Sequence, residues 1–226
     1  MRTPRTSLVM MRVLAVILIA LAFSGCRVEK IAPGGAGASA AAAGSAGPGQ
    51  PNLAAVVAKM WGPKVLPYLR ARAGDLTPLL KSLRTDPSAA HAAHGYRESG
   101  TDGPWSMVTT FTGRIVSVDT SSVVGRVGVD VTGNGQADVL VQIGPVIQGT
   151  VIRDSLGFIS FNDYPDQIEF AELAEAFNKE AYVTALKGLS GVSLKGRTVT
   201  ILGVFPARQH GLPVVTPVEF KLEARS

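Results

Sequence analysis

The chain has 226 residues, of which 46% are hydrophobic, 17% charged and 6% aromatic, so it can bury the core of one domain and is not disordered throughout. Its single cysteine excludes an internal disulfide framework and a cysteine-based zinc ribbon. The formal net charge of +5 favours nucleic acid or an anionic membrane as a partner, provided that the charge belongs to the folded part.

Residues 1–25 are typical of a lipoprotein signal peptide. A basic stretch precedes an apolar run over residues 13–23, and this run has about half of the ~20 residues that a membrane-spanning helix needs. It ends in Phe23-Ser24-Gly25-Cys26, which resembles the lipobox of bacterial lipoproteins, with Phe where that motif most often has Leu. We therefore expect cleavage before Cys26, acylation of its thiol, and a protein that is lipid-anchored at the periplasmic face of a bacterial membrane. An ordinary signal peptide with an incidental cysteine, or a signal anchor, is the alternative.

Cleavage of this signal changes the charge. It removes Arg2, Arg5 and Arg12 and no acidic residue, so the net charge falls from +5 to +2. Nucleic acid is therefore not expected as a partner, because its binding depends on many basic contacts to phosphates.

Residues 26–51 are expected to form the lipidated N-terminus and a tether. From position 33 onward they are almost entirely Gly, Ala, Ser and Pro, without charges or an apolar period. Such a segment buries too little surface to fold by itself.

Residues 52–104 predict a short helical segment. Asn52 is a good N-cap for a helix over 53–60, and Trp61-Gly62-Pro63 is expected to break that helix. A second helix is expected from about Pro63 and a third over 77–83. A short fourth helix is expected to start at Asp86-Pro87-Ser88, to carry residues 89–93 and to be closed by Gly95.

Residues 105–226 predict an α+β domain that is mainly β. Runs rich in Val, Ile and Thr indicate strands over 107–119, 123–131, 138–143, 197–205 and 214–222, and apolar residues at helical spacing indicate a helix over 167–186 that opens at Pro165 or Asp166. Three strands, a helix and two strands resemble an OB-fold, a five-stranded barrel whose helix, between strands 3 and 4, plugs one end. A split α+β sheet of another topology is the alternative.

Residues 143–178 are the most distinctive part of the sequence. They contain Gly144-Pro145, Gly149-Thr150, Arg153-Asp154, the sequence FISF over 158–161 and QIEFA over 167–171. On these motifs, with Trp61, Pro67, Gly95 and the Asp130…Asp138 turn, most of residues 53–222 resembles DUF2291, a family of predicted periplasmic lipoproteins of unknown function. The resemblance implies an exported lipoprotein, often encoded beside sugar-type ABC transporters.

Polar residues of this stretch form a candidate ligand site. Arg153 is expected to contact an anion or a sugar, with these polar partners on the same side: Asp154, Asn162, Asp163 and Gln167. The structural alternative is that Arg153 pairs with an acidic neighbour and that Asn162 or Asp163 caps the following helix.

Two patterns are weak metal candidates. Asp130, Asn134 and Asp138 resemble the start of a calcium loop, but Thr132 replaces an acidic ligand and Val141 stands in place of the closing Glu, so a plain hairpin turn is the stronger interpretation. His91 and His94 have a spacing that metals use, without a third ligand nearby. We expect no metal and no cofactor.

The sequence favours a non-enzymatic accessory lipoprotein that contacts an ABC transporter, a solute-binding protein or their sugar-like ligand through the Arg153-Asp154 loop. No catalytic residue is assigned, because the common enzyme motifs are missing. One alternative is a small envelope hydrolase or carbohydrate-modifying enzyme that uses paired carboxylates such as Asp154 and Asp163. Another is a structural envelope protein that binds only other proteins.

Overall fold

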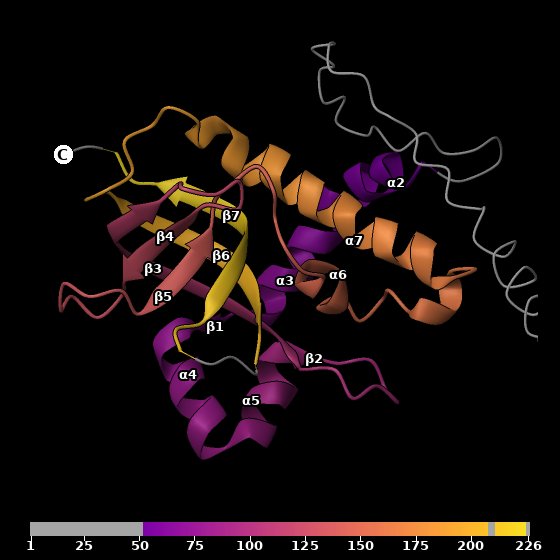
Figure 1. Ribbon diagram of the computed structural model, residues 1–226. Helices are drawn as coiled ribbons and strands as arrows, with labels where there is room; N and C mark the ends of the chain where they lie inside the picture. The colour runs from indigo at the N-terminus through magenta and orange to yellow at the C-terminus, as the bar shows by residue number, and fades with distance from the viewer. Residues whose placement is uncertain (1–51, 208–210, 225–226) are drawn as a thin grey trace, which may run out of the picture. The chain divides into compact units, whose positions relative to one another are not determined.

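Five strands form a closed barrel in the computed structural model, which describes residues 52–207 and 211–224 (Figure 1). The barrel strands follow the order β3-β4-β5-β7-β6, and β6 pairs back with β3; the two-residue strands β1 (Gly74–Asp75) and β2 (Gly95–Tyr96) also pair with β3. The bounds are β3 Ser106–Asp119, β4 Arg126–Asp130, β5 Val139–Gln142, β6 Thr198–Pro206 and β7 Val214–Leu222. The predicted OB-like barrel, with a helix between its third and fourth strands, is confirmed.

The 14-residue strand β3 closes the barrel. Its first part pairs antiparallel with β6 from Ser106↔Pro206 to Arg114↔Thr198, and its last part pairs with β4. The pairing between β5 and β7 is short and parallel, with the two register pairs Leu140↔Val214 and Val141↔Val215. We call this pairing the parallel seam. A strand that is long enough to serve two neighbours lets the sheet curl on itself without a free edge.

The barrel interior is built from alternate residues of its strands, because successive side chains of a strand point to opposite faces. Met107, Phe111 and Ile115 of β3 belong to this buried core, together with valines of β4 and β5. The β-branched runs seen in the sequence therefore supply the packing surface.

Helical segments cover both ends of the barrel. At one end, Leu76 and Leu79 of α4 (Leu76–Thr85) join the barrel core. At the other end, Leu186 enters the same core from the turns η3 (Tyr182–Leu186) and η4 (Lys187–Leu189), which continue α7 (Gln167–Ala181). Figure 1 shows α4 below the barrel and the end of the α7 segment above it. The end of the predicted helix therefore plugs one end of the barrel. The sequence did not predict that α4 would plug the other end.

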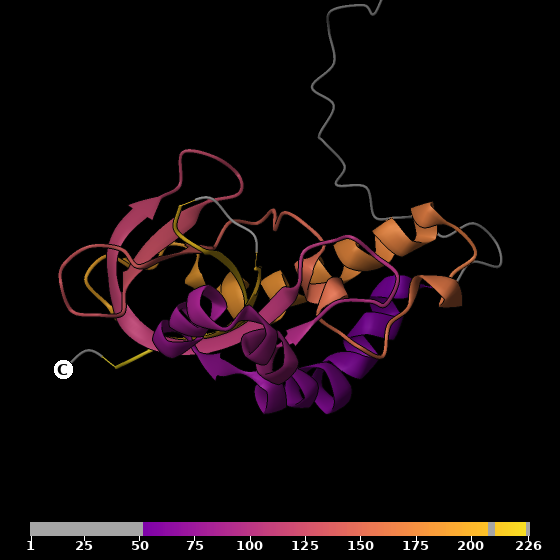
Figure 2. The same ribbon diagram turned by 90° about the horizontal axis from the view of Figure 1, so that it is seen from below.

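A second core lies between the outer face of the barrel and a helical layer. Val108, Val204 and Val218 point outward from β3, β6 and β7 into this core. The layer consists of α7 and of α2 (Leu53–Met60), η1 (Trp61–Val65) and α3 (Leu66–Arg72), with the Trp61 and Phe177 ring centroids 6.5 Å apart. Figure 2 shows these helices beside the barrel.

The predicted break at Trp61-Gly62-Pro63 is wrong. The helix continues through the π-helical turn η1, in which the amide of Leu66 donates to the carbonyl of Trp61. Pro63 lacks an N–H and its ring clashes with the preceding turn of a regular α-helix, and a widened turn relieves that clash. Because Trp61 and Val65 are buried in the second core, packing favours continuation of the helix.

The remaining elements are short. They are β1 (Gly74–Asp75), α5 (Pro87–His94), β2 (Gly95–Tyr96), α6 (Val151–Asp154) and η2 (Phe161–Asp163). Asn52 and Asp86 cap α2 and α5 by accepting bonds from the amides of Ala55 and Ala89. Within the described ranges, no helix has the length and apolar character to cross a membrane. The predicted division between residues 52–104 and 105–226 stays a prediction.

We predict that Gly144→Ala destabilises the protein. A Cβ at Gly144 would collide with the carbonyl oxygens of Val123 and Val124, against which the chain packs as it leaves β5. The free energy of unfolding in urea should fall by about 1–3 kcal/mol, as overpacking of a rigid site does. Gly62→Ala is the control: nothing lies within 4 Å of its Cβ position, and it should be neutral or stabilising by about 0.5–1 kcal/mol. Equal effects of the two changes would contradict this account.

Candidate functional site

A cleft of about 460 Å³, lined by apolar surface and several polar groups, lies between the outer face of the barrel and the segment that leads into α6. This volume lies in the range of small-molecule sites. We call it the polar cleft, and its lining residues are Pro104, Ser106, Arg126, Gln142, Gln148, Gly149, Thr150, Val151, Asp154, Pro206, Val214 and Thr216.

The carboxamide of Gln142 builds this cleft. Its Nε2 donates to Oγ1 of Thr216 at 2.7 Å and to the carbonyl of Gln148 at 3.2 Å, and its Oε1 accepts from the Gln148 amide at 2.9 Å. The side chain is 4% exposed and joins β5, β7 and the loop before α6. From the other side, Nδ2 of the buried Asn178 on α7 donates to the carbonyls of Ile147 and Gly149.

Three polar groups in the cleft have unused hydrogen-bonding capacity among the described residues. The hydroxyl of Ser106, which is 3% exposed, has no partner there, and the hydroxyl of Thr216 accepts from Gln142 without donating its own proton. Arg126 is exposed and forms no ion pair in the described part of the chain. These groups are available to a ligand.

Arg153 and Asp154 pair with each other beside the cleft. Nε and an Nη of Arg153 donate to Oδ1 of Asp154 at 2.8 and 2.6 Å, and Oδ2 of Asp154 accepts from Oγ1 of Thr150 at 2.5 Å. The guanidinium also donates to the carbonyl of Phe170 at 2.7 Å and lies 3.7 Å from the centroid of its ring. Arg153 therefore fixes α6 to the start of α7.

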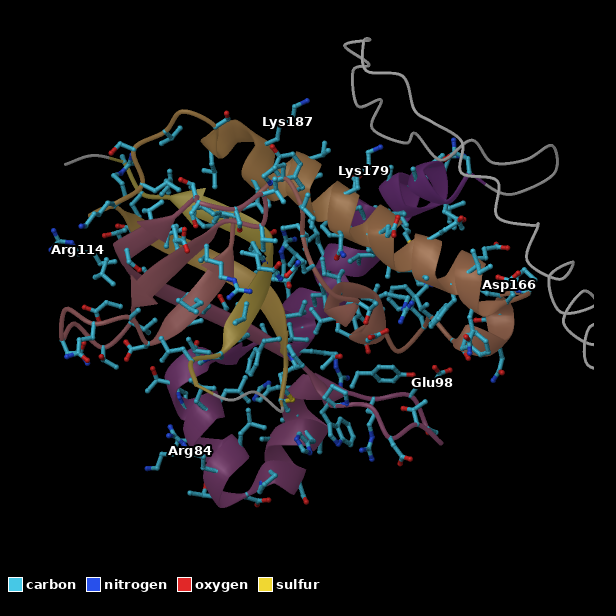
Figure 3. All side chains as sticks on the ribbon, in the orientation of Figure 1. Arg84, Glu98, Arg114, Asp166, Lys179 and Lys187 are labelled. Carbon is cyan, nitrogen blue, oxygen red and sulfur yellow. The ribbon has the colours of Figure 1, made fainter. Side chains whose placement is uncertain are left out.

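A second hollow, of about 350 Å³, lies on the other side of this pair. Arg153, Phe161 and Phe170 line it together with Glu98, whose Oε1 accepts from the Ser160 hydroxyl and the Phe161 amide. Glu98 is labelled in Figure 3. Burial, and then the charge of Glu98, raise the pKa of Tyr96 at its edge.

The other predicted ligand residues do not join this pair. Asn162 and Asp163 lie exposed in η2, and Gln167 is the exposed first residue of α7. No hydrogen bond or ion pair between described residues links them to Arg153 or Asp154. The cap of α7 is Asp166, whose Oδ1 accepts from the amides of Ile168 and Glu169, and not Asn162 or Asp163 (Figure 3).

The calcium-like loop is closed by its own hydrogen bonds. The carboxylate of Asp130 accepts from the amides of Gly133 at 2.7 Å, Asn134 at 3.3 Å and Gly135 at 2.7 Å. Asp138 accepts from the Val131 amide at 2.8 Å and the Thr132 amide at 2.9 Å. The Asn134 side chain accepts from the Gln136 amide. These oxygens serve the turn, as expected of a hairpin loop.

The two histidines are also engaged within the fold. The His91 ring stacks on Trp105, with centroids 4.6 Å apart, and Nδ1 of His94 lies 2.9 Å from the carbonyl oxygen of Arg72. Across residues 52–207 and 211–224, no group of three or more His, Cys, Asp or Glu side chains is placed to hold a metal ion.

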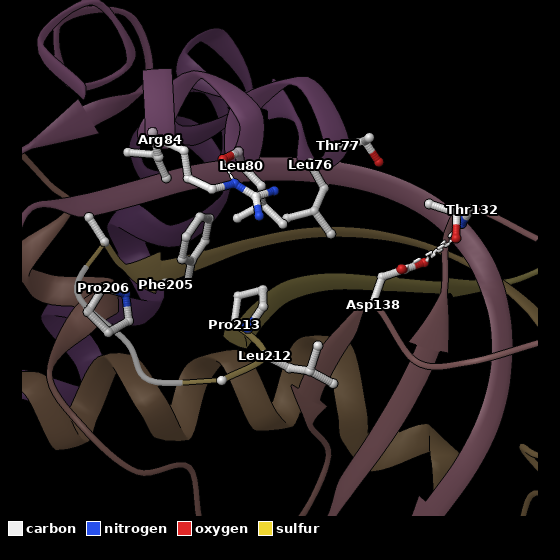
Figure 4. Close-up of a pocket in the computed structure, with 13 residues that line it drawn as sticks. Leu76, Thr77, Leu80, Arg84, Thr132, Asp138, Phe205, Pro206, Leu212 and Pro213 are labelled. Carbon is white, nitrogen blue, oxygen red and sulfur yellow. Dashed lines mark hydrogen bonds between the residues drawn. The ribbon is translucent and has the colours of Figure 1, made fainter. Parts of the chain in front are cut away.

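A further hollow, of about 480 Å³, lies between α4 and the ends of β6 and β7 (Figure 4). Leu76, Leu80 and Phe205 form apolar walls, and Arg84 and Asp138 lie at its edges. Arg84 donates to the carbonyl of Leu80, and Asp138 accepts from Thr132. Arg84 and Asp138 are therefore each bonded within their own segment.

The model of DUF2291, a predicted periplasmic lipoprotein family, matches residues 16–221. The chain belongs to this family. The protein is therefore a lipid-anchored periplasmic lipoprotein, and the match begins within the apolar run before Cys26. The lipidation site Cys26 itself lies outside the described residues.

Among solved structures, the crystal structure of an OB-fold protein from Thermotoga maritima MSB8 is similar. The TM-score is 0.61 at 19% sequence identity, over 77% of this chain and 99% of that one. This likeness shows the fold alone. No curated protein matches the chain.

Sequence reasoning missed most of the polar cleft. Ser106, Arg126, Gln142 and Thr216 are common residues on four different strands, and only the barrel register brings them to one face. The sequence carried one signal: Gln142 is polar within an apolar strand.

We predict that Asp130 stabilises the fold in a pH-dependent way. The amide of Gly135, and then those of Gly133 and Asn134, hold the pKa of Asp130 below its usual value. The stabilisation is therefore fully present above the unfolded value of about 3.9 and is lost as the pH falls through the lowered folded pKa. Asp130→Asn should lower the free energy of unfolding in urea at pH 7, and the difference from the native chain should shrink below about pH 4.

The control is Asp163→Asn, because no described residue hydrogen-bonds to the Asp163 side chain. It should leave stability unchanged at both pH values. A difference between native chain and Asp130→Asn that stays constant with pH would contradict the role given to the carboxylate.

Proposed function

We propose that this lipoprotein is a non-enzymatic accessory component of a solute-uptake system of the sugar-type ABC class, and that it contacts the transporter or its solute-binding protein. Membrane anchoring places the domain on the side of the membrane where such a system receives its solute. The observation that carries the proposal is an exposed surface at the start of α7.

This surface combines apolar and polar side chains. Ile168 is 71% exposed and Phe161 is 37% exposed. They are accompanied by Asn162, Asp163 and Gln167, which are all exposed. We call these five residues the contact surface. Exposed apolar side chains with a polar rim are typical of protein interaction sites.

The contact surface has a rigid support. Phe161 and Tyr164 pack on the Phe170 ring, with centroids 5.4 and 5.5 Å away. The Arg153 guanidinium also packs on the Phe170 ring and donates to the Phe170 carbonyl. A preformed surface loses less conformational entropy on binding, which favours association.

The hydrolase alternative has less support. Such an enzyme needs a proton donor and a base or nucleophile in one cleft. Both carboxylate oxygens of Asp154 already accept hydrogen bonds, and Asp163 is exposed on η2. The polar cleft in turn favours the accessory function over a purely structural protein, because a structural protein has no need of it.

We predict that Ile168→Asp strongly reduces capture of the partner. The native lipidated chain and the variant are crosslinked in cells, purified in detergent, and their co-purified proteins are compared by quantitative mass spectrometry. An ABC-transporter subunit or solute-binding protein should be recovered with the native chain and should fall about tenfold or more with the variant, as for a central interface residue.

The matched control is Val123→Asp, which places the same charge on another exposed β-branched aliphatic residue, 64% exposed, on the loop between β3 and β4. It should leave recovery unchanged. Repeated recovery of no uptake protein with the native chain would contradict the proposed function, and equal losses with the two variants would contradict the assignment to the contact surface.

A further inference from the structure

We propose that the polar cleft is a binding site for a small hydroxylated carboxylate, such as a hydroxy acid or a sugar acid. This site lies on the barrel wall and does not include the contact surface. The proposal stands on the cleft alone and does not depend on the uptake partner.

The cleft offers hydroxyl groups that the fold leaves free. Ser106 on β3 is 3% exposed, and its hydroxyl has no hydrogen-bond partner among the described residues; its oxygen is not fully buried, so it is open to the cleft that it lines. Thr216 on β7 is 1% exposed and has a proton to donate. Gln142 fixes Thr216 at 2.7 Å, so that this group is already positioned. Ligand hydroxyls are the natural complement of both.

The cleft also offers one free guanidinium. Arg126 begins β4 opposite Gln142 of β5, and its charge is not paired in the described structure. Its register partner on β3, Asp119, accepts hydrogen bonds from the amide and hydroxyl of Ser121; these bonds, and then the charge of Arg126, lower the pKa of Asp119, so the two residues attract each other without forming an ion pair. A planar guanidinium binds a carboxylate through two parallel hydrogen bonds.

The charges of the cleft select an anion of single charge. Asp154 lies in the lining, but Arg153 neutralises it through two hydrogen bonds. Arg126 forms no ion pair among the described residues, although the charge of Asp119 acts on it from β3, and a single carboxylate is enough to bind its guanidinium. A neutral polyol would leave Arg126 unused, and a phosphate dianion would bring a second negative charge near Asp154.

The size of the cleft agrees with a small hydroxylated carboxylate as its ligand. The cleft holds about 460 Å³, within the range in which proteins bind small molecules. Pro104 and Pro206 supply stiff apolar parts of the lining, and the loop of Gln148 and Thr150 supplies another part. Because Gln142 and Asn178 hold this loop, the site is preformed.

The test measures binding of matched acids and neutral compounds to the full lipidated chain in detergent by isothermal titration calorimetry. The probes are gluconate against glucitol, glucuronate against glucose, and acetate as an acid without hydroxyls. At least one of the two sugar acids should bind about tenfold or more tightly than its neutral partner and than acetate, since a hydrogen bond to a charged group contributes about 1.5–3 kcal/mol.

Arg126→Gln should weaken binding of that acid about tenfold or more and leave the neutral partner unchanged. Ser106→Ala should weaken both compounds. Arg114→Gln is the control, because it removes an exposed arginine of β3 that does not line the cleft and is labelled at the far edge of the barrel in Figure 3.

Each result decides a separate point. Failure of both sugar acids to bind, or binding that Arg126→Gln leaves intact, overturns the proposed site. Equal binding of acid and neutral partner overturns the choice of an anion, and equal binding of acetate overturns the role of the hydroxyls. None of these results bears on recovery of an uptake protein through the contact surface, so the two proposals fail separately.

Discussion

The polar features of this domain depend on the carboxamide of Gln142. The parallel seam between β5 and β7 has only two paired positions, and Gln142 extends it by a hydrogen bond to Thr216. The same side chain binds both backbone groups of Gln148, so that it holds the loop between β5 and α6 against the barrel. A buried carboxamide whose N–H and C=O groups are all hydrogen-bonded holds the loop in one position, because displacement of the loop would leave these groups without partners.

Placement of that loop connects the two proposed sites. The loop forms one wall of the polar cleft and leads directly into α6, where Arg153 and Asp154 pair. Arg153 then donates to the carbonyl of Phe170 and packs on its ring, which Phe161 of the contact surface also contacts. A continuous set of packed and hydrogen-bonded groups thus connects the polar cleft with the contact surface.

The sequence predicted the barrel well because its strands alternate β-branched residues and its helix has a clear apolar period, both of which are local signals. It failed at Trp61-Gly62-Pro63, where burial of Trp61 outweighed the local preference of Gly and Pro for a break. It singled out Arg153 and Asp154, which are adjacent in the chain and pair with each other in the structure. It missed Ser106, Arg126 and Thr216, since their proximity depends on the pairing of distant strands, which local patterns do not encode.

The most direct test of this account is hydrogen exchange measured on Gln142→Ala and on Gln136→Ala, a control on an exposed loop residue. The account predicts that residues 143–156 lose protection in Gln142→Ala, whereas residues 199–205 of β6 keep the protection of the native chain and Gln136→Ala changes neither segment. Unchanged protection of residues 143–156 in Gln142→Ala would contradict the claim that this side chain positions the loop and, through it, the cleft.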